Sequence, residues 1–130
     1  MKLLLDTHIW IWGLRDPGRL SEQVRNALRA DEENELWLSS ISTWEALTLR
    51  AKGRISLPED VGTWLSLATQ RMREAPLTHE IALAAHRLKW EHRDPADRFL
   101  VATAQVLDLV LVTADARVVE YLHIKTLPNI

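Results

Sequence analysis

Four acidic residues occupy positions from which a folded chain can bring their side chains together. They follow short apolar runs or lie in the early turns of expected helices: Asp6, Glu45, Asp97 and Asp115. Asp6 directly follows the apolar run 3–5, and Asp115 comes three residues after Val112. If both runs are strands of one parallel sheet, these two carboxylates lie at the edge where such sheets bind their ligands.

Four carboxylates at one edge need compensating positive charge. At about 5 Å and an effective dielectric near 20, each pair repels by about 3 kcal/mol. The sequence supplies no set of four fixed cations, whereas one hard divalent ion neutralises several oxygens. Oxygen ligands without a His-x-His or cysteine pair suit Mg²⁺ or Mn²⁺ better than Zn²⁺. Two such ions about 4 Å apart can activate a water and stabilise the leaving oxygen of a phosphodiester.

Most of these acids also have a purely structural explanation. Asp6 and Asp115 can cap helices, and Asp97 can be a favourable charge in a first helical turn. Glu45 is harder to explain in this way, because the residues four positions before and after it are apolar and offer no cation. An acid there is expected to have a partner from elsewhere in the fold.

The first half of the chain alternates apolar runs with helical patterns. The expected elements are a strand at 3–5, a helix over 8–14, a turn at 16–18, a helix from Ser21 to about Ala30, a strand at 36–38, and a helix over 41–51 that ends at Gly53. In the last of these helices, five residues fall on one face, which is predicted to pack on the core: Ile41, Trp44, Leu47, Thr48 and Ala51.

The second half continues the alternation after a break at Pro58. The expected elements are a helix over about 60–73, a very short strand at 76–77, a helix capped by Thr78 around 81–90, a helix capped by Asp94 and reaching Leu107, a strand at 109–112, a short helix after Asp115, and a last strand near 124–127. Asp94 is a possible rival ligand, but its place before Pro95 favours the capping role.

Strands separated by ten or more helical residues need crossover connections, which give parallel pairing. The predicted fold is therefore α/β, a three-layer α/β/α sandwich with a mostly parallel central sheet. The length of 130 residues predicts a single domain over 1–130.

The composition sets limits on partners and compartment. Hydrophobic residues make up 47% and charged residues 26%, which is ordinary for a globular protein. A net charge of −2 means that nucleic acid binding would need a local basic patch. Candidate cations are Arg15 with Arg19, Arg50 with Lys52 and Arg54, and Arg93 with Arg98; solvated surface is an equal alternative.

The absence of cysteine excludes disulfides and thiolate zinc sites. The apolar start is interrupted by Asp6, His8 and Arg15, and no stretch of ~20 apolar residues follows. A cytoplasmic protein without membrane contact is expected.

The chain resembles the PIN-domain ribonucleases, and specifically the VapC-type toxins of bacterial and archaeal type II toxin–antitoxin pairs. The matching segments run in the family's order over nearly the whole chain: Leu3-Leu4-Leu5-Asp6-Thr7-His8, Ser42-Thr43-Trp44-Glu45, Asp94-Pro95-Ala96-Asp97-Arg98 with 99–104 after it, and Leu111-Val112-Thr113-Ala114-Asp115. The first and third of these segments are specific, whereas the glutamate alone is a weak signal.

The resemblance implies metal-dependent endonucleolytic cleavage of RNA that leaves a 5′-phosphate and a 3′-hydroxyl. It implies that Asp6, Glu45, Asp97 and Asp115 are the catalytic and metal-binding acids, with Mg²⁺ or Mn²⁺ as the ion. Either Glu45 or Asp97 then orients the attacking water. The resemblance also implies a VapB-type antitoxin that covers the site, and a homodimer.

Three other functions fit parts of the pattern. A receiver-like signalling domain has this length, a parallel α/β order of elements and an acidic pocket at strand ends, and Lys125 resembles its lysine after a strand. Against it, the first strand ends in Asp6-Thr7 rather than in an acidic pair, and no isolated aspartate closes a third strand. A haloacid dehalogenase-like phosphatase would need an aspartate where His8 stands. A PIN fold that binds RNA or protein without cutting has no feature of the sequence in its favour.

Several other residues carry weaker signals. Thr7 and Thr113 are predicted to hydrogen-bond the acids, although they can also serve only in turns and caps. Trp10 and Trp12 belong either to the core or to a partner surface. The five histidines are scattered, show no metalloprotease spacing, and are assigned no chemistry.

Overall fold

Five strands form a sheet in which every neighbouring pair is parallel. The computed structural model describes residues 1–29, 33–121 and 123–130. The strands are β1 (Lys2–Leu5), β2 (Glu35–Ser39), β3 (Arg73–Ala75), β4 (Val110–Thr113) and β5 (Thr126–Pro128), in the order β3-β2-β1-β4-β5. The chain builds outward from β1 to β3 and then crosses to β4 and β5. The order therefore reverses between β1 and β4, where such sheets form a ligand crevice.

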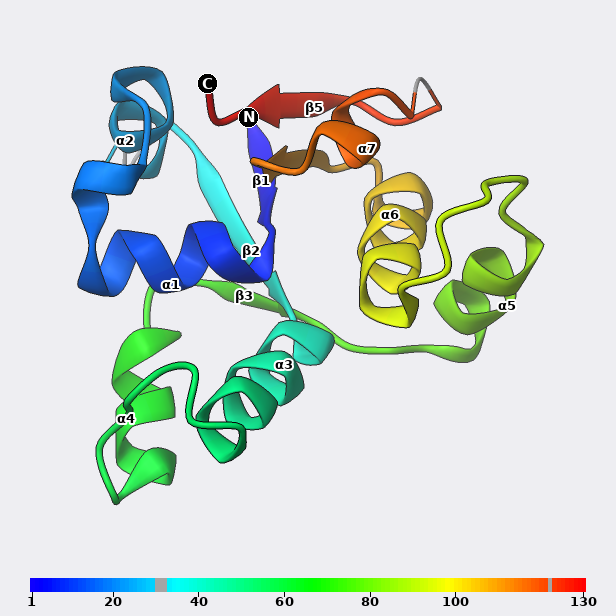
Figure 1. Cartoon of the computed structure of the whole chain (residues 1–130). Coiled ribbons are helices and arrows are strands. Elements are labelled where there is room, and N and C mark those ends of the chain that lie inside the picture. Colours follow the sequence, from blue (N-terminus) through cyan, green and yellow to red (C-terminus); the bar gives the residue numbers. More distant parts are fainter. Residues whose placement is uncertain (30–32, 122) are drawn as a thin grey trace.

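Helices lie on both faces of this sheet, which confirms the predicted three layers (Figure 1). They are α1 (Thr7–Arg15), the short 3₁₀ helix η1 (Pro17–Arg19), α2 (Glu22–Arg29), α3 (Ser40–Ala51), α4 (Val61–Ala68), α5 (His79–Arg87), α6 (Pro95–Leu107) and α7 (Ala116–Val119). Helices α1, α2 and α4 pack on one face and α6 and α7 on the other, and α5 packs on α6. Helix α3 follows β2 at the carboxyl end of the sheet and contacts both α1 and α6.

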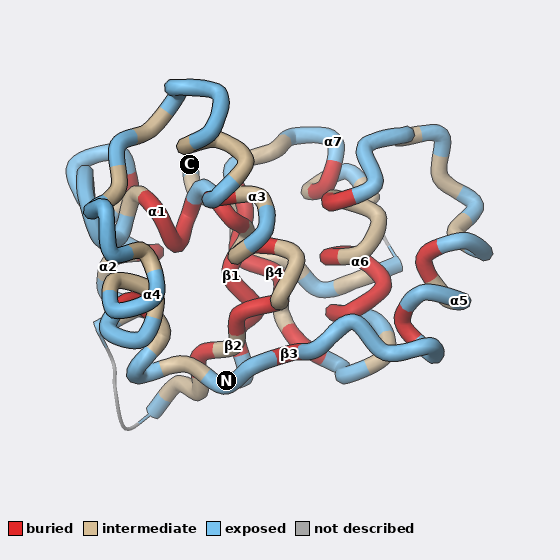
Figure 2. The backbone as a smooth tube through the Cα atoms, turned by 90° about the horizontal axis from the view of Figure 1, so that it is seen from below, coloured by how far each residue is buried: buried red, intermediate tan, exposed pale blue. Residues whose placement is uncertain are grey.

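The central strand β1 is buried on both faces (Figure 2). Leu3 and Leu5 belong to the cluster that includes Trp10 of α1, whereas Leu4 belongs to the cluster that includes Leu100 of α6. This alternation follows from the two-residue period of a strand. Because both faces are covered by apolar side chains, the position of the residue after β1 is firmly fixed.

Trp10 is a core residue. Its side chain is 1% exposed, and its Nε1 donates to the carbonyl oxygen of Ala68 at 3.1 Å. Trp12 is half-buried, and the Arg19 guanidinium lies 4.2 Å from its ring centroid. Of the two predicted alternatives, the core location is therefore confirmed for Trp10.

The predicted caps are confirmed where the structure describes them. Asp94 accepts hydrogen bonds from the backbone N–H groups of Ala96 and Asp97 at the start of α6, and Thr78 caps α5. Gly53 has a φ of +72°, the left-handed conformation that ends the preceding helix. Ser21 Oγ accepts from the N–H of Val24 at the start of α2. The predicted end of that helix, Ala30, lies outside the described residues.

The predicted helix over 60–73 is too long. Helix α4 ends at Ala68, and residues Arg73–Ala75 form β3 instead. These three residues pair with Trp37–Ser39 of β2, so tertiary pairing overrides the helical pattern. The strand predicted at 76–77 is also wrong, because β3 ends directly before Pro76, which has no N–H for a ladder. The last strand is likewise shifted, to Thr126–Pro128.

The predicted core face of α3 is correct at Ile41, which packs against a core cluster, but wrong at Trp44, Leu47 and Ala51, which are exposed. Trp44 is 61% exposed and Leu47 38% exposed. The buried side of this helix carries the small residues Ser42 and Ala46 instead. In this orientation of α3, Glu45 contacts Thr7 at the start of α1, next to the carboxyl end of β1.

The helix predicted to reach Trp90 ends at Arg87, and residues 88–94 form a loop before α6.

No helix in the described ranges is long and apolar enough to cross a membrane.

Candidate active site

Asp6 and Thr113 join the ends of the two strands where the sheet order reverses. Asp6 follows β1 and caps α1, accepting a 2.7 Å hydrogen bond from the N–H of Thr7. Its second oxygen accepts a 2.7 Å hydrogen bond from the hydroxyl of Thr113, the last residue of β4. Thr113 Oγ1 also accepts from the N–H of Asp115 at 3.1 Å. The two acids that follow β1 and β4 are therefore linked through one buried hydroxyl.

Glu45 reaches the same edge from α3. The hydroxyl of Thr7 donates to Glu45 Oε1 and lies 2.9 Å from the hydroxyl of Ser42. Thr7 and Ser42 are both fully buried. Thr7 therefore positions two acids: its hydroxyl donates a hydrogen bond to Glu45, and its backbone N–H donates one to Asp6.

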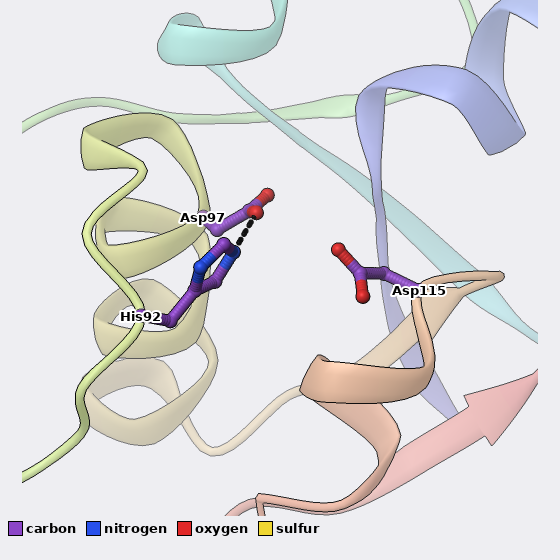
Figure 3. A group of neighbouring side chains, drawn as sticks. All are labelled: His92, Asp97 and Asp115. Carbon is purple, nitrogen blue, oxygen red and sulfur yellow. Dashed lines mark hydrogen bonds and ion pairs between the residues drawn. The ribbon is translucent and has the colours of Figure 1, made fainter.

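Asp97 enters from the first turn of α6 and forms a hydrogen bond with His92 Nε2 (Figure 3). His92 lies in the loop before this helix. Asp115 faces the pair from the start of α7. One potential ligand atom from each of His92, Asp97 and Asp115 lies within 4.8 Å of the others. These three residues could hold a metal ion.

Asp115 differs from the other acids because it has a cation beside it. It caps α7 and accepts hydrogen bonds from the backbone N–H of Arg117 at 2.9 Å and from the guanidinium at 3.2 and 3.3 Å. Within the described residues, Asp6, Glu45 and Asp97 form no ion pair with a lysine or arginine. Among the four carboxylates, called the acidic cluster below, only Asp115 is therefore seen paired with an arginine in the described part of the chain.

Burial and the neighbouring charges shift the pKa values of all four acids. Burial raises the pKa of Asp6, and the charge of Asp115 adds to the effect. Burial, together with the charges of Asp6 and Asp97, raises the pKa of Glu45 from 4.5 to about 6. Burial raises the pKa of Asp97 in the same way. For Asp115, burial acts upward, but the hydrogen bonds and charge of Arg117 outweigh it and lower the pKa.

The raised pKa values of Asp6, Glu45 and Asp97 mean that their ionised forms are disfavoured in the free protein. A cation bound at this edge of the sheet would stabilise the ionised forms. The donors are carboxylate oxygens and one imidazole nitrogen, a set that fits a divalent metal. All four acids singled out from the sequence thus lie at one edge, and each is within electrostatic reach of another member of the cluster.

Sequence reasoning missed His92. No chemistry was assigned to any histidine from the sequence, whereas the structure places His92 at the site through its hydrogen bond with Asp97. The five-residue spacing between them matches no helical or metal-binding pattern, so the sequence carried no signal. Its position depends on the loop, which only the folded structure defines.

Arg98 was predicted to belong with Arg93 either to a basic patch or to solvated surface. It belongs to neither, because its guanidinium is used in hydrogen bonds within the fold. Its guanidinium donates to four carbonyl oxygens, those of Ala85, Leu88, Trp90 and His92, at 2.7–3.1 Å. It therefore fixes the loop that carries His92.

Comparison with known proteins identifies the family. The model of the PIN domain matches residues 3–122, so the chain belongs to the PIN-domain family. The chain is 34% identical over 122 residues to ribonuclease VapC22 of Mycobacterium tuberculosis, covering 93% of this chain and 92% of that protein. This membership excludes the receiver-like and phosphatase alternatives.

Solved structures agree on the fold. A chain of the VapBC2 complex from Rickettsia felis, bound to a promoter DNA fragment, superposes with a TM-score of 0.75 at 15% identity over 98% of both chains. A chain of DNA-bound VapBC from Salmonella typhimurium gives 0.75 at 21% identity, over 100% of this chain and 99% of that one. FitAcB from Neisseria gonorrhoeae gives 0.71 at 21% identity, over 98% and 97%.

Proposed function

We propose that this chain is a VapC-type ribonuclease toxin of a toxin–antitoxin pair, built as one PIN domain over residues 1–130. In this proposal, Asp6, Glu45, Asp97 and Asp115 are the catalytic and metal-binding acids, and the ion is Mg²⁺ or Mn²⁺. The substrate is an RNA phosphodiester, and cleavage leaves a 5′-phosphate and a 3′-hydroxyl. The ribonuclease activity of the 34% identical relative supports this assignment.

One observation carries the proposal. The acidic cluster lies where the strand order reverses, and three of its four members have no lysine or arginine partner in the described part of the chain. A purely structural role would leave several kcal/mol of repulsion uncompensated. Binding of a divalent cation removes that cost and explains why acids from four separate segments converge.

The choice of Mg²⁺ or Mn²⁺ follows from the ligand atoms. Carboxylate oxygens dominate the cluster, and hard cations prefer oxygen. His92 contributes a possible nitrogen, which Mn²⁺ accepts more readily than Mg²⁺. Its hydrogen bond with Asp97 alternatively orients that carboxylate and leaves the ligand set all-oxygen.

Each acid has a task that its surroundings support. Asp97 and Asp115, which lie close together with His92, would hold the ion with Asp6 beside them, and a bound divalent cation would stabilise the charge that develops on the phosphate during cleavage. Glu45 is suited to orient the attacking water, because its carboxylate lies beside Asp6 and Asp97 at the same edge of the sheet. The Thr7 hydroxyl holds the Glu45 carboxylate in place.

The partners form the second part of the proposal. Several structural neighbours are toxin–antitoxin complexes, which supports a VapB-type antitoxin for this chain. The exposed apolar side chains of Trp44 and Leu47 lie on α3, the helix that carries Glu45. A partner that buries them would lie on the helix that carries Glu45. A homodimer is the other proposed assembly, and the mass of the purified protein in solution tests it.

The test of the enzyme is cleavage of a mixed cellular RNA pool by purified protein with Mg²⁺, with Mn²⁺ and with a chelator. Cutting that requires the metal, and that Asp6→Asn abolishes, is expected. Absence of cutting by folded protein free of antitoxin would contradict the proposal and favour a PIN fold that binds without cleaving. End-group analysis of the products checks the 5′-phosphate.

A further inference from the structure

A large hollow opens beside the acidic cluster, on the side of the sheet covered by α6 and α7. Its volume is about 960 Å³, and its walls are residues 89–94 of the loop before α6 and the residues Arg117, Glu120, Tyr121 and His123. Figure 1 shows this loop on the same side of the sheet as α7. Ligand pockets range from about 300 to 1,000 Å³, so the hollow is large enough for a nucleotide.

Aromatic rings from both walls meet in this hollow, called the aromatic pocket below. The Trp90 ring lies 4.7 Å from His92 and 5.1 Å from Tyr121, and Tyr121 lies 5.1 Å from His123, all as centroid distances. Two segments separated by about thirty residues in the sequence thus share one chain of rings. Trp90 and Tyr121 are half-buried, so they are anchored in the core while part of each side chain stays accessible.

The loop wall is fixed before any ligand arrives. Arg98 holds it through hydrogen bonds to the carbonyl oxygens of Leu88, Trp90 and His92, and through a fourth to Ala85 at the end of α5. A preformed pocket loses less conformational entropy on binding than a loop that must first become ordered. Little conformational entropy of the Trp90 backbone is therefore lost when a ligand binds.

The charges of the aromatic pocket are balanced. Lys89, Arg93 and Arg117 provide three cations, and Glu91, Asp94 and Glu120 provide three carboxylates. A groove that follows a phosphate backbone by charge alone would be strongly positive. This pocket is better suited to stack a base on its rings, with few phosphate contacts and with carboxylates that can accept hydrogen bonds from amino groups on the base.

The pocket is continuous with the acidic cluster through two residues. His92 lines the pocket and hydrogen-bonds Asp97. Arg117 lines it and binds Asp115. A group seated among the rings is therefore next to the acids.

We infer that the aromatic pocket binds one unpaired nucleotide of the RNA strand, next to the phosphate that the acidic cluster cleaves. This inference rests on the proposed ribonuclease function and specifies where a base next to the cleaved bond is held. Bases in a duplex are stacked on one another and present no free face to the rings.

Binding of fluorescein-labelled RNA tests the inference, with anisotropy as the readout. The protein carries Asp6→Asn so that RNA stays intact. The probes are short homopolymeric strands of each of the four nucleotides, and the duplex of the adenylate and uridylate strands. At least one single strand is expected to bind more tightly than the duplex. A shallow salt dependence is expected, with log Kd rising by no more than about 1.5 per unit of log salt, if Lys89 and Arg93 are the cations that contact phosphates.

Variants of the pocket locate the binding. His123→Ala and Tyr121→Leu are each expected to weaken single-strand binding by about fivefold or more, because each removes a stacking surface. Tyr121→Phe keeps the ring and is expected to bind normally. His79→Ala, an exposed histidine outside the pocket, is the matched control. Circular dichroism checks that each variant is folded, and His123→Ala tests an exposed side chain even if Tyr121→Leu does not fold.

The outcomes separate the inference from the proposed function. Unchanged affinity in folded His123→Ala and Tyr121→Leu, or equal binding of duplex and single strands, would overturn the pocket while leaving a cleaving enzyme in place. Binding of a cognate antitoxin that depends on these residues, with RNA binding unchanged, would make the pocket a protein-docking surface and overturn the inference. If the unmodified protein does not cleave RNA, the proposed ribonuclease function itself is contradicted.

Discussion

Thr113 donates a 2.7 Å hydrogen bond to Asp6 across 107 positions of sequence. The two residues end neighbouring strands, so this one contact aligns the carboxyl ends of β1 and β4. It also fixes one oxygen of Asp6 while the N–H of Thr7 fixes the other. The carboxylate at the centre of the acidic cluster is thus oriented by one hydroxyl and one backbone N–H.

Asp6→Asn is expected to abolish cleavage without unfolding the protein. Activity should fall by more than about a hundredfold, since even residues that only orient a metal ligand are worth about that much. The melting temperature without metal should stay equal or rise, because burial disfavours the charged form of Asp6 and asparagine is an equally good cap.

Asp108→Asn is the matched control for this change. Asp108 is an exposed aspartate far from the cluster, and its left-handed backbone conformation suits asparagine. Full activity in folded Asp6→Asn would refute the assignment of Asp6.

Thr7→Val tests the support beneath Glu45. The change keeps the shape of the side chain but leaves Glu45 and the buried Ser42 hydroxyl without their partner. Stability should fall by about 1–3 kcal/mol, and affinity for Mn²⁺ should fall about 10- to 100-fold.

Thr103→Val provides the comparison for Thr7→Val. Its buried hydroxyl bonds only the helical carbonyl of Phe99, so stability should fall while Mn²⁺ affinity is kept. Calorimetric titration with Mn²⁺ distinguishes the two variants, and equal Mn²⁺ affinity in both would contradict a supporting role for Thr7.

The raised pKa of Glu45 predicts how stability depends on pH in the absence of metal. The folded state holds its proton up to about pH 6, whereas the unfolded state releases it near 4.5. The folded state therefore binds more protons between these values, and stability falls as the pH rises from about 4.5 to 6. The contribution is about 1 kcal/mol after allowance for solvent screening.

Urea unfolding in a chelator, compared between the unmodified protein and Glu45→Gln, isolates this contribution. The difference between the two curves should change across this pH window. A bound cation should reverse the trend, because it stabilises the ionised cluster and binds more tightly as the pH rises. A pH-independent difference would refute the raised pKa.

Arg98→Lys is expected to destabilise the protein by about 2–4 kcal/mol. A lysine cannot reach four carbonyl oxygens at once, and each carbonyl that loses its partner carries a cost. Thermal unfolding measures the loss, and Arg87→Lys, an exposed arginine at the end of α5, serves as control. Unchanged stability in Arg98→Lys would mean that the loop needs no such support.

The sheet could be predicted because its central strands carry continuous apolar runs and lie far enough apart for parallel crossovers. Asp6 and Asp115 then fall at one edge by topology alone. The strand β3 could not be predicted, since Arg73, Glu74 and Ala75 show no strand pattern and are extended only because β2 pairs with them. The exposure of Trp44 could not be predicted either, because an exposed apolar face of a helix has the same spacing of apolar residues as a face packed on the core.

The central place of β1 has a consequence for synthesis. Its neighbour on one side is β2, but its neighbour on the other is β4, which begins at Val110. A growing chain on the ribosome therefore carries Leu3–Leu5 with one edge unpaired until more than a hundred residues have been made. Asp115 is added later still, so a nascent chain has no complete acidic cluster before that point. Any nuclease activity that needs all four acids arises only after β4 and the start of α7 have emerged.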